Sequence, residues 1–182
     1  MTILVGVKCS DGVVIGADSA VTSAPLPGML VMTETGASKI ELPFDAEPVI
    51  VATTGSVGMS MRFFEELRDN YAKGQNIRRL LPNSAVKFAT AVAAIATNNF
   101  RSTYSPIMQL PQIGFGLGAL VGFVAENKPQ VVEFDSVQFQ PDFKGVKDDA
   151  TGRWRTRPYA TMGSGQTMGD PFLAEANHMI FG

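Results

Sequence analysis

The second residue, Thr2, combines a nucleophile and a base in one residue. The chain opens with Met1-Thr2 and continues into an apolar run over residues 3–7 that is rich in β-branched residues. If the initiator methionine is removed, the threonine hydroxyl becomes a nucleophile that its own α-amine can activate. An α-amine has a reference pKa of about 7.7–8.0, so near neutral pH it can take up and return a proton. The alternative is an inert first strand residue, because many proteins begin with Met-Thr.

Several short motifs follow Thr2 along the chain. They are Asp18-Ser19-Ala20-Val21-Thr22, Ser38-Lys39-Ile40, Thr53-Thr54-Gly55-Ser56 and Met162-Gly163-Ser164-Gly165. In this order the series resembles the β-type subunits of the proteasome family, which are N-terminal nucleophile (Ntn) hydrolases. The bacterial HslV-type peptidases resemble the chain most, because they also begin with Met-Thr and have no long propeptide. The resemblance covers residues 2–181 and implies a four-layer αββα sandwich within the α+β class.

The resemblance gives Thr2 the role of attacking a peptide carbonyl to form an ester-linked acyl-enzyme, which water then hydrolyses. Asp18 lies at the end of the second predicted strand, where a carboxylate can orient the amine or a lysine. If Asp11-Gly12 are the two turn residues of the first hairpin, Thr2 faces Val21 and Asp18 is about 10 Å away. A bulge or a different loop would close that gap. The alternative is a surface aspartate at a strand end.

Lys39 lies among apolar neighbours in a predicted strand, where a lysine needs a partner, and Asp18 is the natural one. Its positive charge near Thr2 would lower the pKa of the hydroxyl and of the α-amine. The alternative is a lysine that faces outward from the strand. The spacing between Asp18 and Lys39 exceeds the usual family spacing, so we expect a small insertion within residues 23–37.

Two further positions have a chemical and a structural reading. Gly55 follows a buried strand, and a glycine there lets a backbone N–H approach a substrate oxygen as an oxyanion hole requires. It is equally well explained by the turn alone. Ser164 lies between two glycines at a strand-to-helix junction, where its hydroxyl can bond the threonine amine and shuttle a proton. It also suits a helix N-cap, and the two roles are compatible.

The family match also assigns residues that bind substrate. Thr22 and Gly55 would pair with the substrate backbone. Val21, Thr53 and Val57 would line the pocket for the residue before the cut. These side chains are small or medium and uncharged, so we expect apolar substrate side chains there.

Composition excludes several other classes. The 182 residues favour a single domain, 45% of them are hydrophobic, and the net charge of −2 argues against a nucleic-acid partner. One cysteine excludes an internal disulfide and fits a cytoplasmic location, and we expect no secretory signal and no membrane span. The single histidine, His178, makes a Ser-His-Asp site improbable, and one Cys with one His excludes a zinc site of those ligands. The glycines of residues 114–118 do not fit a dinucleotide motif and indicate a structural role. We expect no cofactor and no metal.

The hydrophobic pattern predicts strands first, then helices, then strands and a last helix. Strands are expected near residues 3–9, 12–18, 29–33, 38–42, 48–54, 115–125, 129–135 and 157–162. Helices are expected at 57–73, with apolar residues at 3–4 residue spacing, at 84–104, with an alanine-rich face, and at 166–180. Residues 140–156 read as an exposed loop, and no repeat or linker divides the chain.

The sequence therefore predicts an N-terminal threonine endopeptidase of a self-compartmentalised, proteasome-like bacterial protease. The resemblance implies as partners peptide or unfolded protein substrates and identical subunits in stacked rings of at least twelve copies, with an ATP-dependent unfoldase as a candidate partner. The helices at 57–73 and 84–104 are the expected ring contacts. A catalytically inactive ring scaffold and an Ntn amidase of a small amide are the alternatives. Family members usually continue beyond the position of Gly182, so we expect residues 1–182 to form one domain that lacks the C-terminal part of the fold.

Overall fold

The computed structural model describes residues 2–26, 29–34, 38–73, 77–104, 116–146, 150 and 155–181. For residues 20–26, 29–34, 99–104 and 180–181 it describes the backbone alone. Within this part of the chain, α-helices and antiparallel sheets alternate along the sequence. This mixed architecture is compatible with the predicted α+β class.

The strands form three antiparallel sheets. A three-stranded sheet has the order β10-β1-β2, a two-stranded sheet pairs β3 with β4, and a five-stranded sheet has the order β5-β6-β7-β8-β9. The bounds are β1 Leu4–Lys8, β2 Val13–Ala17, β3 Ala20–Leu26, β4 Met29–Glu34, β5 Ile40–Glu41, β6 Ile50–Gly55, β7 Leu117–Ala125, β8 Lys128–Phe134, β9 Pro141–Lys144 and β10 Tyr159–Met162.

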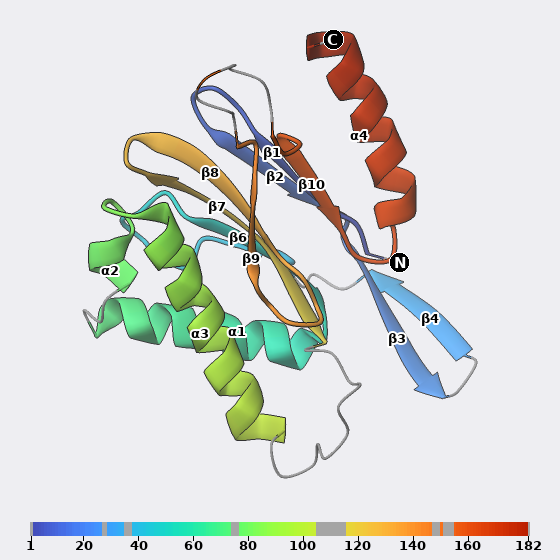
Figure 1. The fold of residues 1–182 in the computed structure, drawn as a ribbon. Coiled ribbons are helices and arrows are strands. Elements are labelled where there is room, and N and C mark those ends of the chain that lie inside the picture. The colour runs from blue at the N-terminus through green and yellow to red at the C-terminus, as the bar shows by residue number, and fades with distance from the viewer. Residues whose placement is uncertain are drawn as a thin grey trace.

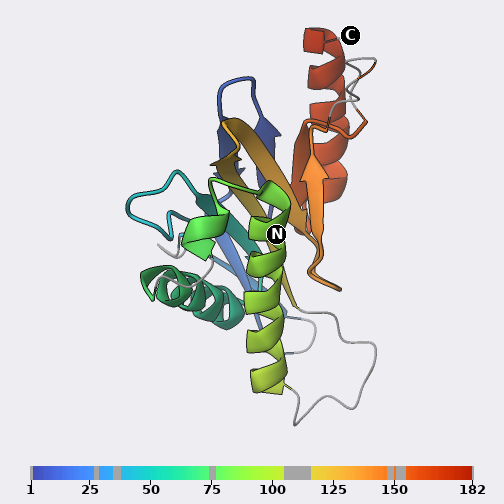
Figure 2. The same cartoon turned by 60° about the vertical axis from the view of Figure 1, so that its left-hand side comes forward.

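Four helices are described: α1 Val57–Ala72, α2 Ile77–Leu80, α3 Ala85–Tyr104 and α4 Gln166–Phe181. Helices α1 and α3 lie on one face of the five-stranded sheet, and the β10-β1-β2 sheet lies against its other face (Figures 1 and 2). Helix α4 contacts β10 and lies on the far side of the molecule from α1 and α3. No described helix is both long enough and apolar enough to cross a bilayer.

Two apolar clusters hold these layers together. The larger one lies between the five-stranded sheet and α1, α2 and α3, and phenylalanines dominate it, among them Phe63, Phe88 and Phe134. The smaller one lies between the two facing sheets and includes Leu4 and Leu120. Burial of such side chains contributes about 1.5–3 kcal/mol each. Thr2 precedes Leu4 by two residues, so a site around Thr2 lies at the edge of the smaller cluster.

Gly118 shows how closely the two sheets approach each other. A Cβ atom at this position of β7 would lie 2.6 Å from Cε of Met162 in β10. A larger residue would therefore require the Met162 side chain to move. This agrees with the structural reading of the glycines in residues 114–118, of which 114 and 115 lie outside the described residues.

The register of the first hairpin corrects one prediction. Strand β1 pairs with β2 so that Lys8 faces Val13, and residues 9–12 form the connection, in which Cys9 N donates to Gly12 O over 2.9 Å. The connection is thus four residues long, not the two-residue turn Asp11-Gly12. This shifts the register by two residues and places Asp18 opposite Ile3, where Asp18 N donates to Ile3 O over 3.1 Å. The gap of about 10 Å expected for a two-residue turn is therefore closed.

Other elements were missed or misjudged. Residues 140–156 were expected to be an exposed loop, but Pro141–Lys144 pair with β8 as β9, because β8 is too apolar to end the sheet uncovered. The short helix α2 and the strand β3 were not predicted. Strand β3 contains Pro25, which lacks a backbone donor, and its ladder with β4 is irregular between Ser23 and Leu26. The β3–β4 hairpin overlaps the segment expected to hold an insertion, and it extends away from the other sheets (Figure 1).

The alanine-rich face of α3 is not a free surface. Ala85, Ala89, Ala93 and Ala96 are all buried in the large core of the same chain. Their small side chains let α3 approach its neighbours closely, as predicted, but within the subunit. The expectation that the helix at 84–104 contacts another subunit stays a prediction. In α1, Phe64 and Leu67 of the predicted stripe are buried, whereas Val57 and Met61 are exposed.

Candidate functional site around Thr2

Thr2 lies just before β1, where three other segments of the chain meet it. Lys39 Nζ is 3.3 Å from Thr2 Oγ1, and Thr2 N donates to Ser164 Oγ over 2.9 Å. The Thr2 carbonyl accepts a hydrogen bond from Gly165 N over 2.9 Å. The hydroxyl, the nitrogen and the carbonyl of Thr2 are thus each held by a different residue.

Asp18 joins the start of β1 to Lys39. Its Oδ1 accepts from Ile3 N over 2.7 Å and from Lys39 Nζ over 3.0 Å. The four-residue hairpin connection places it there, because it brings the end of β2 beside the residue after Thr2. The carboxylate therefore fixes both the backbone next to Thr2 and the ammonium group that reaches the Thr2 hydroxyl.

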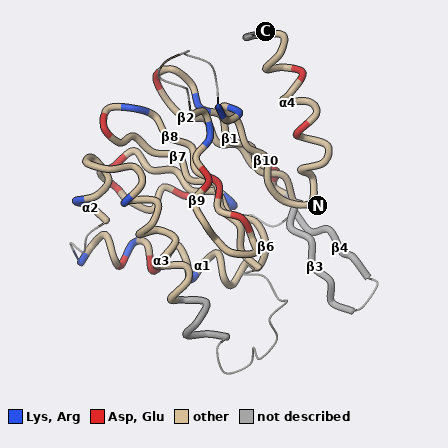
Figure 3. The backbone as a smooth tube through the Cα atoms, viewed as in Figure 1, with Lys and Arg blue, Asp and Glu red and all other residues tan. Residues whose placement is uncertain are grey.

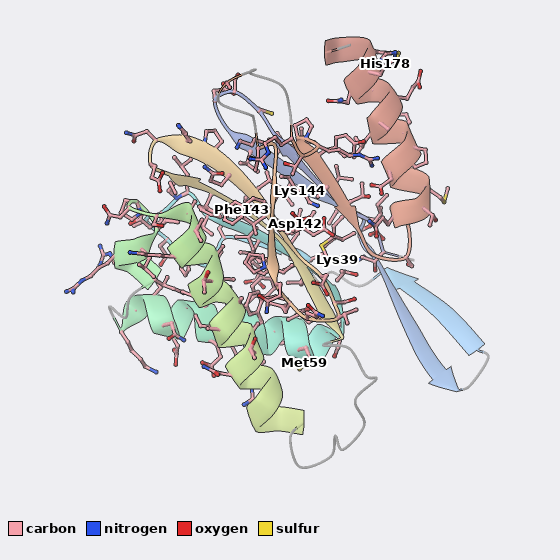
Figure 4. All side chains as sticks on the ribbon, in the orientation of Figure 1. Lys39, Met59, Asp142, Phe143, Lys144 and His178 are labelled. Carbon is pink, nitrogen blue, oxygen red and sulfur yellow. The ribbon has the colours of Figure 1, made fainter. Side chains whose placement is uncertain are left out.

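Lys39 directly precedes β5 and is anchored by its backbone. Its carbonyl accepts a hydrogen bond from Thr53 N over 3.0 Å, which continues the β5–β6 ladder. The side chain is 11% exposed, so little water screens its charge. Figure 4 shows Lys39 at the end of the sheets where the N-terminus lies. Lys39 therefore does not face outward, which was the alternative reading of this residue.

The Gly163-Ser164-Gly165 segment turns the chain from β10 into α4 against Thr2. Gly163 has φ = +91°, and a Cβ there would lie 2.4 Å from the Thr2 carbonyl oxygen. Only glycine fits this conformation and this approach. Helix α4 begins at Gln166, so Gly165 stands at the N-cap position, and the Ser164 hydroxyl is bonded to Thr2 instead.

Gly55 occupies a turn that demands glycine. It has φ = +107°, and a Cβ would lie 2.1 Å from the carbonyl oxygen of Gly116. The next residue, Ser56, donates its N–H to that same carbonyl over 2.9 Å. The turn alone therefore accounts for the glycine, and a role of the Gly55 N–H in binding an oxyanion stays a prediction.

The predicted substrate-binding residues differ in their exposure. Thr53 in β6 is buried, with 4% of its surface exposed, whereas Val57 at the start of α1 is 48% exposed. Val21 and Thr22 lie in β3, where the side chains are outside the described part of the chain. A pocket for the residue before the cut therefore has one described, accessible wall, at Val57.

A cavity of about 400 Å³ opens beside Ser164. Its wall includes Gly55, Gly163 and Ser164, together with the carboxylates Glu133 and Asp135. The two carboxylates come from β8 and the residue just after it, and Figure 3 shows acidic positions along β8 and β9. Sequence reasoning missed these two residues, because neither lies in one of the motifs. Their place next to the Gly163-Ser164-Gly165 segment depends on how β8 and β10 are arranged.

Asp135 is held in its ionised form. Burial raises the pKa of Asp135, but the backbone N–H groups of Gln138 and Val137, at 2.8 Å and 2.7 Å from Oδ1, outweigh this and hold the pKa below its usual value. Hydrogen bonds to the charged form of a carboxylate have this effect. A negative charge therefore persists at this cavity wall at neutral pH.

A second lysine–carboxylate cluster lies on β8 and β9. Lys144 Nζ is 2.8 Å from Glu133 Oε2 and 2.6 Å from Asp142 Oδ2 (Figure 4). Burial lowers the pKa of Lys144, but the bonds to Asp142 and Glu133 outweigh it and raise the pKa above its ordinary value of 10.5. Lys144 is therefore a charged lysine that joins two strands.

Neither His178 nor a metal site forms part of this arrangement. His178 lies towards the far end of α4, away from Lys39 (Figure 4). Within the described ranges, no group of three or more His, Cys, Asp or Glu side chains is arranged to hold a metal ion.

The scan against protein-family models and the search among curated proteins find no match to this chain.

Proposed function

We propose that this chain is an N-terminal threonine peptidase of the proteasome-like Ntn-hydrolase type. One observation carries the proposal. Lys39 Nζ contacts the Thr2 hydroxyl while Ser164 Oγ contacts the Thr2 nitrogen, 3.3 Å and 2.9 Å away. These are the two groups of an N-terminal threonine that must be controlled for it to act as both nucleophile and base. The sequence motifs predict Thr2, Lys39 and Ser164 as site residues although they lie far apart in the chain.

The first chemical step would form the acyl-enzyme. Removal of Met1, which lies outside the described residues, converts the Thr2 nitrogen into an α-amine. The Thr2 hydroxyl attacks the peptide carbonyl, and its proton passes to the α-amine, with Lys39 stabilising the developing alkoxide. The C–N bond of the tetrahedral intermediate then breaks, and the leaving amine takes the proton back from the ammonium group. The product is an ester on Thr2 Oγ1.

The second step would release the product. The α-amine takes a proton from a water molecule as that water attacks the ester, and the proton then returns to Thr2 Oγ1 when the C–O bond breaks. The Gly55 N–H would stabilise the negative oxygen in both steps. Ser164 would keep the amine oriented throughout, since it bonds the Thr2 nitrogen.

The arrangement of the layers supports the same assignment. Helices α1 and α3 lie on one side of the two facing sheets and α4 contacts β10 on the other side, an arrangement compatible with the αββα sandwich (Figure 2). In that fold, a nucleophile at the start of a central strand lies at the edge of the sheets. Thr2 has this position, directly before β1.

The proposal includes assembly into stacked rings in the cytoplasm that enclose the Thr2 sites, with peptides or unfolded proteins as substrates and an ATP-dependent unfoldase as a possible partner. An exposed N-terminal nucleophile would otherwise cut cytosolic proteins without restriction. Exposed apolar side chains are present for such contacts: Val57 and Met61 on α1, Val86 on α3, and Met168 and Phe172 on α4. Contacts between identical subunits close rings when they join different surfaces head to tail.

The inactive ring scaffold is the second candidate. Retained Met1 is the observation that would favour it, because the Thr2 nitrogen would then be an amide and could not act as a base. The small-amide hydrolase would be favoured by a monomer or dimer, because confinement serves to exclude polymers. Both alternatives are compatible with the same fold.

Three measurements on the native protein test the proposal. Intact-mass analysis should show loss of Met1, since threonine is small enough for methionine aminopeptidase to accept at the second position. Incubation with a peptide that carries an electrophile should give an adduct on the N-terminal Thr2 peptide. Light scattering at micromolar concentration should show at least twelve subunits. Fully retained Met1 would defeat the peptidase proposal as stated, and a monodisperse monomer or dimer would favour the small-amide hydrolase.

A further inference from the structure

The cavity beside Ser164 lies on one particular side of Thr2. Its described wall contains Gly163 and Ser164, which contact the backbone of Thr2, but neither Lys39 nor Asp18, which lie on the hydroxyl side. Thr2 itself does not line the cavity, which reaches from Gly55 to Ser164, and Ser164 is the lining residue that bonds the Thr2 nitrogen. A proton that returns from this nitrogen to the departing amine can travel only a hydrogen-bond distance. The part of the substrate that follows the cleaved bond must consequently lie on the nitrogen side.

The cavity has an unbalanced charge. Among the described residues that line it, Glu133 and Asp135 carry carboxylates, and no lysine, arginine or histidine is present. Lys144 contacts Glu133 from the neighbouring strand β9 and offsets part of its charge. Asp135 bonds backbone N–H groups, which carry no net charge, so its own charge is retained.

We propose that this cavity is the binding site for the residues after the cleaved bond and that it selects a cationic side chain there. This inference rests on the proposed function and adds the substrate class. A volume of about 400 Å³ is sufficient for an extended lysine or arginine side chain. Together with the apolar side chain expected before the cut, it defines a peptidase that cleaves between an apolar and a basic residue.

Matched peptides measure this preference directly. Internally quenched peptides would carry lysine, norleucine or glutamate at the first or the second position after the cut and be otherwise identical. Norleucine has nearly the length of lysine without its charge. The processed wild-type protein should cleave the lysine peptide with a kcat/KM about fivefold above that of the norleucine peptide, the factor expected of one partly exposed ion pair. The glutamate peptide should be the poorest substrate.

Two conservative variants and a control locate the preference. Asp135→Asn keeps an oxygen that can accept from Val137 and Gln138, so the turn survives while the charge is lost. Glu133→Gln tests the second carboxylate, and Asp142→Asn is the control, because Asp142 also bonds Lys144 but does not line this cavity. Asp135→Asn and Glu133→Gln should each lower the ratio of lysine to norleucine cleavage towards one, and Asp142→Asn should leave it unchanged. Thermal unfolding verifies that each variant is folded.

The outcomes separate this inference from the proposed function. Cleavage of the lysine and norleucine peptides at equal kcat/KM, or a preference that survives both substitutions combined, would overturn the cationic site while leaving the peptidase intact. A processed wild-type protein that cleaves none of the peptides and forms no Thr2 adduct would overturn the peptidase and this site together. A preference lost on Asp135→Asn with unchanged cleavage of the norleucine peptide supports the inference.

Discussion

Two lysines of this chain are each paired with a carboxylate, but they differ in the other group that the ammonium contacts. Lys39 bonds Asp18 at 3.0 Å, and Lys144 bonds Glu133 at 2.8 Å. The lysine side chains are 11% and 17% exposed, so both charges are poorly hydrated. The next group within reach of Lys144 is a second carboxylate, Asp142, whereas the next group within reach of Lys39 is the Thr2 hydroxyl.

This difference separates an ion pair that joins strands from one that can do chemistry. Two carboxylates contact the Lys144 ammonium, and its pair with Glu133 links β9 to β8. The side-chain partners of Lys39 include the neutral Thr2 hydroxyl beside the Asp18 carboxylate, so its positive charge can stabilise a negative oxygen that forms on Thr2. The comparison predicts that substitution of Lys39 mainly lowers activity, whereas substitution of Lys144 mainly lowers stability.

Substitution of Thr2 should have the largest effect. Thr2→Ala removes the nucleophile and little packing area, so peptide hydrolysis should fall by about four orders of magnitude or more, while assembly and thermal unfolding stay unchanged. Thr2→Ser is the matched variant, because it retains a hydroxyl and should retain part of the activity. Steady-state hydrolysis of a fluorogenic peptide measures both. Normal turnover by a verified Thr2→Ala sample would place the active site elsewhere.

The direct comparison of the two lysines comes next. Lys39→Ala should reduce kcat by about two to three orders of magnitude, the range for loss of a group that stabilises a developing oxyanion. Lys144→Ala should leave kcat within about threefold for a substrate with neutral residues after the cut, because its ammonium contacts strand carboxylates alone among the groups described. An equal loss of kcat in both variants would break the distinction between the two clusters.

Ser164 should have a smaller effect than Lys39, because it contacts the nitrogen and not the attacking oxygen. Ser164→Ala should lower kcat by about tenfold, less than the roughly 10²–10⁴-fold of a group that transfers the proton itself, with little change in KM. Ser60→Ala serves as the control, since Ser60 Oγ bonds a backbone carbonyl at the start of α1. Unchanged kcat in Ser164→Ala would show that orientation of the amine does not depend on this hydroxyl.

The sequence was sufficient to select the site residues but not to predict all of their contacts. Thr2, Asp18, Lys39 and Ser164 were chosen from motif order, and the structure brings them together. The distance from Thr2 to Asp18 was overestimated, because hairpin register depends on loop length and Asp11-Gly12 resembles a two-residue turn. The dominant helices and strands were predicted because they are long and periodic, as in α1 and β7.

The contacts that were missed are those between segments distant in the sequence. Strand β9 is four residues long and contains Pro141 and Asp142, so its composition resembles a loop, and its pairing with the apolar β8 decides its structure. The carboxylates Glu133 and Asp135 line the cavity beside Ser164, and β8 packs against β1 and β2 of the facing sheet, an arrangement that no local pattern reveals. Local propensity cannot report an interaction that tertiary contacts create.

The smallest expected effect is on stability, and it belongs to Lys144. Removing its charge in Lys144→Met leaves Glu133 and Asp142 without their cation and should lower the free energy of unfolding by about 1–2 kcal/mol at pH 7. Because the pKa of Lys144 is raised in the folded state, its contribution is fully present below the unfolded value of 10.5 and is lost as the pH rises through the folded pKa. Urea unfolding of wild type and variant at pH 7, 9 and 11 should therefore give equal differences in the free energy of unfolding at pH 7 and 9 and a smaller difference at pH 11.

Lys73→Met is the control, since Lys73 forms an exposed pair with Asp69, four residues earlier in the chain, and should change stability less. A larger loss of stability for Lys73→Met than for Lys144→Met would contradict the assignment of Lys144 as the lysine that joins the strands.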